Sequence, residues 1–210
     1  MTTANKITLV RIAMIPFFVV FAILGGPKYD AIALVLFCLA SFTDFLDGYI
    51  ARKYNQVTDF GKFVDPLADK LLVTAALVIF VERGLLAAWM VFVILAREFI
   101  ITSLRNVAAA KGQVMAAAWS GKVKTCVQIA GIIILFLYAI WMGDAFTADT
   151  IAVATIGGAD GPTAIMTTGN LTWIPTVVSW VVTLVTIYSG YDYLHRNWAL
   201  VAEGATRPKA

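Results

Sequence analysis

Four aspartates in one short stretch of the chain are spaced so that they could bind a metal ion together. Asp44 and Asp47 are three residues apart, and Asp65 and Asp69 are four apart, so each pair would share one face of a helix. Clustered carboxylates repel one another, and Mg²⁺, Mn²⁺ or Ca²⁺ would relieve this repulsion because these cations prefer oxygen ligands. The stretch contains neither Cys nor His, which argues against zinc. The spacing therefore predicts a carboxylate site for a hard divalent cation.

Small residues accompany the aspartates on the same predicted helix faces. Gly48 and Ala51 follow Asp44 at helical spacing, and Gly61 precedes Asp65 by one turn. Their small side chains would let a ligand approach the backbone closely. A simpler interpretation is that the aspartates lie at a membrane interface and pair with neighbouring cations. These cations are Arg52, Lys53, Lys62 and Lys70.

Apolar helices must position these residues. Hydrophobic residues make up 60% of the 210 residues and charged residues 14%, and the mean hydropathy is +0.84. Soluble domains carry about 25% charged residues, so the composition excludes a cytosolic globule, a disordered chain and a nucleic-acid-binding protein with a basic surface. A membrane-spanning helix needs about 20 apolar residues. We therefore predict an all-α polytopic membrane protein, one catalytic domain over residues 1–210, with six transmembrane helices near residues 7–25, 30–51, 63–82, 85–106, 121–142 and 173–194.

The basic residues predict how these helices are oriented. Six spans place both termini on one side of the membrane, and all but two of the 16 Lys and Arg residues, Lys28 and Arg83, fall on that side. Positive residues favour the cytoplasm. We therefore expect both termini and the aspartates on the cytoplasmic side of the cell membrane, and residues 143–172 in a loop on the opposite side. Pro66 favours a helix that starts nearby, with Asp65 as its N-cap.

The stretch from Asp44 to Asp69 resembles the signature of the CDP-alcohol phosphotransferases. Its eight fixed positions match in DxxDGxxAR, followed after eight residues by Gly61 and then by Asp65 and Asp69. The resemblance implies an integral membrane enzyme with six helices, often a homodimer, and a two-metal site that binds Mg²⁺ or, alternatively, Mn²⁺. It implies that Asp69 is the general base and that the metal ligands are Asp44, Asp47, Asp65 and Asp69. It also implies that CDP contacts Asp47, Gly48, Ala51, Arg52 and Gly61.

Further motifs are similar to one subgroup of this family, the phosphatidylglycerophosphate synthases. The run Asn5-Lys6-Ile7-Thr8-Leu9-Val10-Arg11 matches their N-terminal Asn-x-x-Thr-x-x-Arg, although Ala4 replaces the usual proline. This similarity extends over residues 4–135. It implies transfer of a phosphatidyl group from CDP-diacylglycerol to glycerol 3-phosphate, with release of CMP, in phospholipid biosynthesis. The alternatives within the family are cardiolipin, phosphatidylserine and phosphatidylinositol-phosphate synthases. A remote alternative is a cation transporter that uses the aspartates as its ion site.

A set of basic residues could bind the phosphate of the acceptor. Arg97, Ile101 and Arg105 share one helix face, and Arg97 lies about 12 Å further into the membrane than Arg105. A buried arginine needs an anion or a carboxylate, and Glu98 is adjacent in sequence but about 100° around the helix. Charge pairing and cytoplasmic anchoring are the alternative roles. The candidate residues for binding glycerol phosphate are Arg11, Arg97, Arg105, Lys122 and Lys124.

Two further features of the sequence are Thr8 and the Gly-rich stretch 157–165. Thr8 could contact the nucleotide, or it could cap or flank a helix. The Gly-rich stretch 157–165 is expected to be part of the exported loop, and no function is assigned to it.

Overall fold

The computed structural model describes residues 3–53, 59–110, 119–143 and 173–198, with the backbone alone for residues 3–7, 44–53, 59–66, 69 and 110. The described residues are all-helical, with no β-strand among them. The helices are α1 (Thr3–Leu24), α2 (Pro27–Lys53), α3 (Asp59–Glu82), α4 (Ala88–Ala110), α5 (Trp119–Met142) and α7 (Trp173–Arg196). Each predicted apolar segment is therefore a helix. The predicted loop 143–172, with its Gly-rich stretch, lies outside the described residues after Gly143.

The described helices start within four residues of the predicted spans, and two of these starts change an expectation. α3 begins at Asp59, so the backbone is already helical before Asp65 and this residue is not an N-cap, which would have non-helical dihedral angles. α4 begins at Ala88 rather than near residue 85, because Leu85 and Leu86 still close the end of α3. Their backbone N–H groups donate to the carbonyl of Phe80 at 2.8 and 3.1 Å.

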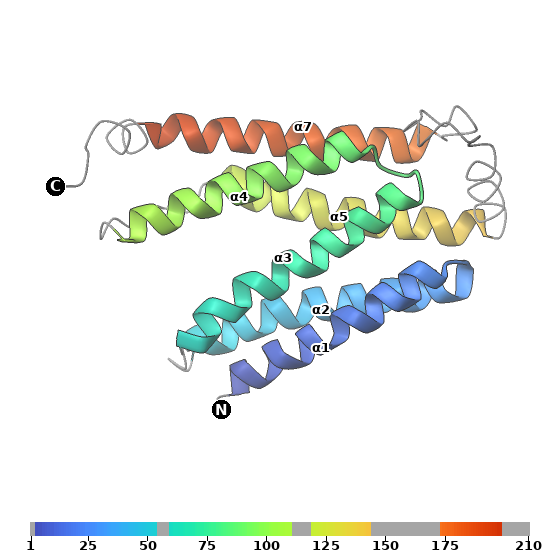
Figure 1. Cartoon of the computed structure of the whole chain (residues 1–210), viewed down its shortest axis with the longest axis horizontal. Coiled ribbons are helices and arrows are strands. Elements are labelled where there is room, and N and C mark those ends of the chain that lie inside the picture. Colours follow the sequence, from blue (N-terminus) through green and yellow to red (C-terminus); the bar gives the residue numbers. More distant parts are fainter. Residues whose placement is uncertain (1–2, 54–58, 111–118, 144–172, 199–210) are drawn as a thin grey trace, which may run out of the picture.

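Glycines end α1 and α3 and reverse the chain. Gly25 and Gly26 have φ angles of 64° and 88°, and Gly84 has a φ of 69°, all in the left-handed region that favours glycine. Pro27 then occupies the first position of α2, where its missing N–H breaks no helical hydrogen bond. These turns make α1 antiparallel to α2, and α3 antiparallel to α4, as Figure 1 shows.

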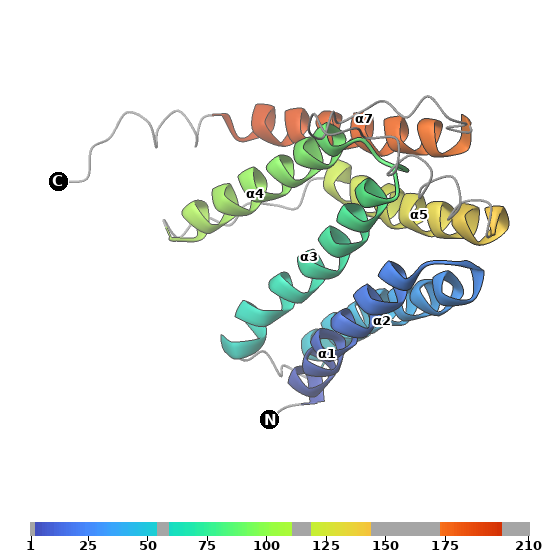
Figure 2. The same ribbon diagram turned by 45° about the vertical axis from the view of Figure 1, so that its right-hand side comes forward.

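The helices form a bundle in which α3 joins two groups. α1 packs on α2 and α3, while α7 packs on α4 and α5. Figures 1 and 2 show α3 crossing obliquely between these groups, with the N- and C-terminal ends of the described chain at the same end of the bundle. The same end holds the end of α2, the start of α3, the end of α4 and the start of α5. The predicted aspartate and basic segments are therefore gathered at one end of the fold.

Four phenylalanines fix the crossing of α3 over the other helices. The ring of Phe18 lies 5.9 Å from those of both Phe37 and Phe136, and the rings of Phe80 and Phe136 are 4.8 Å apart. All four side chains are fully buried. Tilted and edge-to-face ring pairs at these distances add stability beyond their buried area. This cluster joins α1, α2, α3 and α5 in one core.

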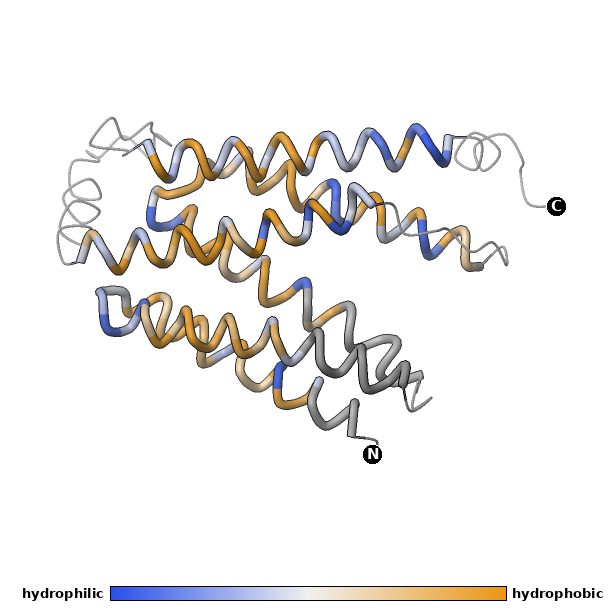
Figure 3. Tube along the Cα trace, turned by 180° about the vertical axis from the view of Figure 1, so that it is seen from behind, coloured by the Kyte–Doolittle hydropathy of each residue, from blue (hydrophilic) through white to orange (hydrophobic). Residues whose placement is uncertain are grey.

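Large apolar side chains also cover the outside of the bundle. Phe17, Val35, Phe92 and Leu184 are each more than half exposed, and similar residues occur on every described helix. Figure 3 shows hydrophobic residues along most of the described helices, with hydrophilic ones at turns and towards the C-terminal end of α7. Within the described residues, α5 and α7 are long and apolar enough to cross a membrane by length and composition. So apolar an exterior marks a surface that meets lipid or a partner rather than water.

Candidate active site

The structure places the predicted carboxylates on two helices that contact each other. Asp44 and Asp47 lie on α2, and Asp65 and Asp69 lie on α3, each within a helical stretch of backbone. α2 packs on α3, and the end of α2 lies beside the start of α3 (Figures 1 and 2). The predicted CDP-contacting residues on the same two helices are Gly48, Ala51, Arg52 and Gly61. The side chains of all these residues lie outside the described part of the structure, so the metal and CDP contacts stay predictions.

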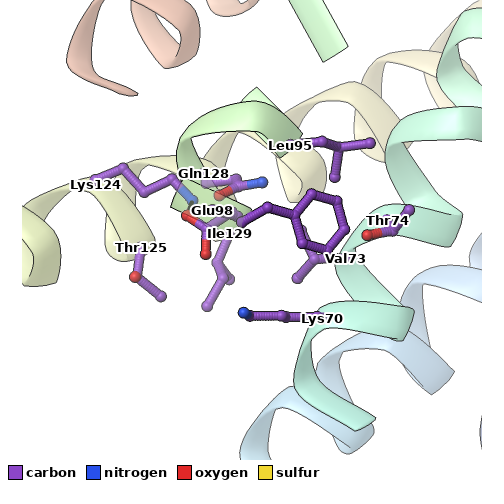
Figure 4. Close-up of a pocket in the computed structure, with 10 residues that line it drawn as sticks. Lys70, Val73, Thr74, Leu95, Glu98, Lys124, Thr125, Gln128 and Ile129 are labelled. Carbon is purple, nitrogen blue, oxygen red and sulfur yellow. Dashed lines mark hydrogen bonds and ion pairs between the residues drawn. The ribbon is translucent and has the colours of Figure 1, made fainter. Parts of the chain in front are cut away.

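A pocket begins directly beside this segment of α3. Lys70, the residue after Asp69, lines it together with residues one turn further along α3 and residues of α4 and α5. The pocket has a volume of about 530 Å³, including its open mouth. Figure 4 shows the Lys70 ammonium group pointing from α3 towards side chains of α4 and α5. The lining residues are Lys70, Val73, Thr74, Leu95, Glu98, Phe99, Lys124, Thr125, Gln128 and Ile129.

One carboxylate holds two cations at the wall of this pocket. Glu98 Oε1 accepts a hydrogen bond from Arg97 Nη1 at 2.8 Å and another from Lys124 Nζ. Lys124 is buried and Arg97 is largely buried, so these charges are mostly shielded from water. Charge-assisted hydrogen bonds of this kind are stronger than neutral ones. The expectation that a deep arginine needs a carboxylate is confirmed.

Glu98 pairs with Arg97 although the two residues are neighbours on one helix. Adjacent residues point about 100° apart on a helix, yet the guanidinium of Arg97 reaches the carboxylate of Glu98. Both side chains are long and flexible enough to curve towards each other. Helical angle alone therefore did not identify Glu98 as the partner of Arg97.

Arg97 sits in a seam between α4, α5 and α7. Its Nη2 donates to Ser189 Oγ at 2.5 Å, and its Nε is buried without a hydrogen-bond partner in the described structure. Gly190 makes room for it, because a Cβ atom there would lie only 3.2 Å from Arg97 Cγ. A Cβ atom at Gly121 would lie 3.8 Å from Nη2, an ordinary contact distance. The helices thus approach closely around a cationic group, and the buried Nε keeps hydrogen-bonding capacity for a further acceptor.

The other predicted basic residues are not among the residues that line the pocket. Arg105 is exposed, and its Nε donates to the Tyr193 hydroxyl at 3.2 Å, with the guanidinium 5.5 Å from the ring centroid. Lys122 is exposed, in contrast to Lys124 two residues later. Arg11 and Thr8 are buried on α1, the helix that packs on α2 and α3. The structure therefore brings Arg97 and Lys124 together and places Arg11 on the side of the aspartate-bearing helices.

Three residues of the site were not predicted as binding residues from the sequence. Lys70 was interpreted as a counter-charge, but it lines the pocket and donates to Thr102 Oγ1 of α4. Gln128 was not singled out, although it follows Lys124 by one helical turn, and that spacing was the available signal. Ser189 gave no signal, because its role depends on α7 packing against α4.

The arrangement gathers cationic side chains beside the aspartate segment. Among the residues whose side chains the structure describes, Lys70, Arg97 and Lys124 lie in or beside the pocket wall, together with the carboxylate of Glu98. Arginine and lysine together suit a phosphate group, which accepts several hydrogen bonds. Chemically, the pocket is suited to a small phosphorylated molecule held next to Asp69.

Comparisons with known proteins agree with this chemistry. A relative from Bacillus subtilis named CDP-diacylglycerol–glycerol-3-phosphate 3-phosphatidyltransferase is 40% identical over 206 residues, covering 92% of this chain and 94% of the relative. A Rickettsia bellii protein with the same name is 34% identical over 189 residues, covering 90% of this chain and 91% of the relative. A Mycobacterium tuberculosis protein named probable phosphatidylglycerophosphate synthase is 42% identical over 132 residues, covering 61% and 63%.

The family assignment rests on most of the chain. The model of the CDP-alcohol phosphatidyltransferase family matches residues 1–188, a range that includes both aspartate pairs, the pocket-lining residues and Arg97. With this match, and with the similarity to the Bacillus subtilis relative along nearly the whole length of both chains, the chain belongs to the CDP-alcohol phosphatidyltransferase family.

Proposed function

We propose that this protein is a phosphotransferase that moves the phosphatidyl group of CDP-diacylglycerol to glycerol 3-phosphate, giving phosphatidylglycerophosphate and CMP in phospholipid biosynthesis. The similarity to relatives named for this reaction supports the choice of donor and acceptor. The single structural observation that carries it is the cationic pocket that starts at Lys70, next to Asp69. An acceptor with a phosphate group needs such a pocket, whereas serine or phosphatidylglycerol does not offer a free phosphomonoester.

The acceptor phosphate is proposed to lie between Lys70, Arg97 and Lys124. These side chains lie in or beside the pocket wall and offer cationic hydrogen-bond donors to an anion. Arg105 lies further out on α4 and would meet the phosphate on its way in. The exposed Lys122 would attract the acceptor phosphate electrostatically at longer range. Arg11 would approach from α1, beside the aspartate-bearing helices.

The four aspartates are proposed to hold Mg²⁺ or Mn²⁺ in a two-metal site. The donor set fits, because it consists of carboxylate oxygens alone, at helical spacing on two contacting helices. When bound, the cations would neutralise charge on the diphosphate and on the departing CMP. The ligands would be Asp44, Asp47, Asp65 and Asp69.

In the proposed reaction, the primary hydroxyl of glycerol 3-phosphate attacks the phosphorus atom that bears the diacylglycerol. The bond from this phosphorus to the oxygen of CMP breaks, and CMP leaves. Asp69 accepts the hydroxyl proton, which makes the oxygen a better nucleophile. The position of Asp69, one residue before the pocket-lining Lys70, supports this role. The CDP group is proposed to contact Thr8, Asp47, Gly48, Ala51, Arg52 and Gly61.

We also propose that all six described helices span the cell membrane, with both termini and the site on the cytoplasmic side. The helices have 22 to 27 residues, enough to cross about 30 Å of hydrocarbon at about 1.5 Å per residue. The apolar exterior supports this placement. Membrane lipids would then surround the bundle and supply CDP-diacylglycerol from within the bilayer. A homodimer is proposed on family resemblance alone.

An assay with purified protein in detergent micelles tests the proposal. CDP-diacylglycerol and Mg²⁺ are supplied with one acceptor at a time: glycerol 3-phosphate, serine, inositol phosphate or phosphatidylglycerol. We expect CMP release with glycerol 3-phosphate and little with the others. Release with another acceptor only would overturn the proposed acceptor but leave the family chemistry intact. Absence of CMP release with every acceptor would overturn the proposed reaction as a whole.

A further inference from the structure

Gln128 is a buried amide that faces the pocket without a protein partner. Its side chain is 4% exposed and lines the pocket from α5. Among the described residues, no hydrogen bond to this amide is found, and its atoms are not among the fully buried ones without a partner, so the amide is open to the pocket. Figure 4 shows the amide beside Glu98, on the pocket side of α5. A polar group that meets the pocket space in this way is placed to hydrogen-bond to something that enters it.

The chemistry of an amide indicates what it would bind. The side chain of Gln128 offers both a donor and an acceptor, whereas a phosphate dianion only accepts hydrogen bonds. A hydroxyl group both donates and accepts, and therefore satisfies both ends of the amide. The cations of the pocket already suit the phosphate. The remaining polar group of an acceptor alcohol is a hydroxyl that does not react.

The pocket has two levels that match such a molecule. Lys70 and Lys124 form one level on α3 and α5, and Thr74 and Gln128 lie one helical turn, about 6 Å, further along the same two helices. Val73, Leu95 and Ile129 add apolar walls to the pocket, which suit a short carbon chain. If the phosphate of an acceptor lies beside Lys70 and Lys124, a hydroxyl group of the same molecule can reach Gln128 one helical turn away.

We propose that Gln128 is a specificity-determining residue that hydrogen-bonds to the non-reacting hydroxyl of the acceptor. Resting on the proposed function, this hydroxyl is the 2-hydroxyl of glycerol 3-phosphate. Sites built to bind a hydroxyl reject analogues that lack it, because a buried protein group is then left unpaired. Gln128 thereby distinguishes glycerol 3-phosphate from phosphorylated alcohols of similar size.

The test compares glycerol 3-phosphate with 3-hydroxypropyl phosphate, which lacks only the 2-hydroxyl. For the wild-type protein, we expect kcat/KM to be about tenfold higher with glycerol 3-phosphate. Gln128→Met keeps the size of the side chain but removes its hydrogen bonds. In this variant, kcat/KM should fall about tenfold for glycerol 3-phosphate and change less than about twofold for the analogue, so that the preference disappears.

Thr125→Val is the matched control on the same helix. Thr125 also lines the pocket, but its hydroxyl already donates to the Gly121 carbonyl at 3.1 Å. This variant should keep the wild-type preference between the two acceptors. If Gln128→Met does not fold, Gln128→Ala serves for the same comparison.

The outcomes separate this inference from the proposed function. Equal use of the two acceptors by the wild-type protein would overturn the role of Gln128, whatever the variants do. An unchanged preference in the Gln128 variants would overturn it as well. In both cases, CMP release with glycerol 3-phosphate would still support the proposed reaction. Absence of CMP release from the wild-type protein with either acceptor would overturn the reaction, and the inference with it.

Discussion

Glu98 of α4 and Lys124 of α5 form an ion pair that joins two helices at the wall of the pocket. The same carboxylate oxygen also accepts a hydrogen bond from Arg97 at 2.8 Å. The carboxylate of Glu98 thus holds two cationic side chains in place at the pocket. This relationship explains how the site can be both ordered and attractive to an anion before substrate arrives.

Removing the charge of Glu98 should destabilise the protein in a way that an anion can reverse. In Glu98→Gln, two neighbouring buried cations lose their carboxylate, and we expect the free energy of unfolding to fall by about 2–3 kcal/mol. Saturating glycerol 3-phosphate should raise the Tm of this variant more than that of the wild type, because the phosphate replaces the lost charge. Thermal unfolding in detergent with and without glycerol 3-phosphate measures both effects. Glu82→Gln, at an exposed site, is the control, and an equal ligand shift in Glu98→Gln and wild type would contradict this role for Glu98.

Lys124 and Lys122 should differ sharply although they are two residues apart. Lys124 is buried at the pocket and Lys122 is exposed. We expect Lys124→Met to lower kcat/KM for glycerol 3-phosphate by about 10- to 100-fold, the value of a charge-assisted hydrogen bond. The KM for CDP-diacylglycerol should change little. Lys122→Met should lower kcat/KM by less than about threefold, since exposed charges act weakly. Steady-state kinetics with varied glycerol 3-phosphate measure both values of kcat/KM. An equal loss of kcat/KM in the two variants would contradict the proposed phosphate position.

The buried pair of Asp30 and Arg83 should stabilise the opposite end of the bundle. Arg83 Nη2 lies 2.6 Å from Asp30 Oδ1 and also donates to the carbonyl of Ala22. Asp30 is 1% exposed, so Arg83→Met would leave a buried unpaired carboxylate and cost about 3–5 kcal/mol of stability. The double variant Arg83→Met/Asp30→Leu should recover much of this loss.

Thermal unfolding of the single and double variants tests this pair. Both variants should keep wild-type CMP release at temperatures where they stay folded, because the pair ties the α1–α2 turn to the end of α3. Figure 1 shows these segments at the end of the bundle opposite the start of α3 and the start of α5. A double variant less stable than Arg83→Met alone would show that the pair is not the source of the effect.

The aspartates should separate into metal-binding and proton-accepting roles. Chelation by EDTA should stop CMP release, and added Mg²⁺ should restore it. Asp65→Asn should raise the Mg²⁺ concentration needed for half-maximal rate, because one ligand is weakened. Asp69→Asn should abolish turnover yet retain some binding of CDP-diacylglycerol, because the amide cannot accept the proton. Turnover near the wild-type rate in Asp69→Asn would remove this residue from the base role.

The helices could be predicted because each signal was local. Apolar runs of about 20 residues, interrupted by Gly25-Gly26-Pro27 and by Arg83-Gly84, gave the helices and the turns that the structure confirms. The start of α4 was placed wrongly because Leu85 and Leu86 are apolar but belong to a turn. Hydrophobicity alone does not distinguish a buried turn from the first turn of a helix.

The pocket could be predicted only in part because it depends on how helices cross. Sequence spacing places residues on one face of a helix, which is how Arg97 and Arg105 were found. Spacing does not show which helix faces contact each other. The sequence therefore did not predict that Lys70 of α3, Glu98 of α4 and Gln128 of α5 line one pocket. The oblique path of α3, held by the cluster around Phe80 and Phe136, brings them together. No local pattern encodes that crossing.

The central claim is tested most directly by product stoichiometry. Purified protein is supplied with CDP-diacylglycerol, Mg²⁺ and glycerol 3-phosphate labelled in its carbon chain, and the label extracted into chloroform is compared with CMP released. We predict one labelled lipid, phosphatidylglycerophosphate, formed in a one-to-one ratio with CMP. Release of CMP without label in the lipid would instead show hydrolysis of the donor or use of another acceptor, and would contradict the proposed reaction.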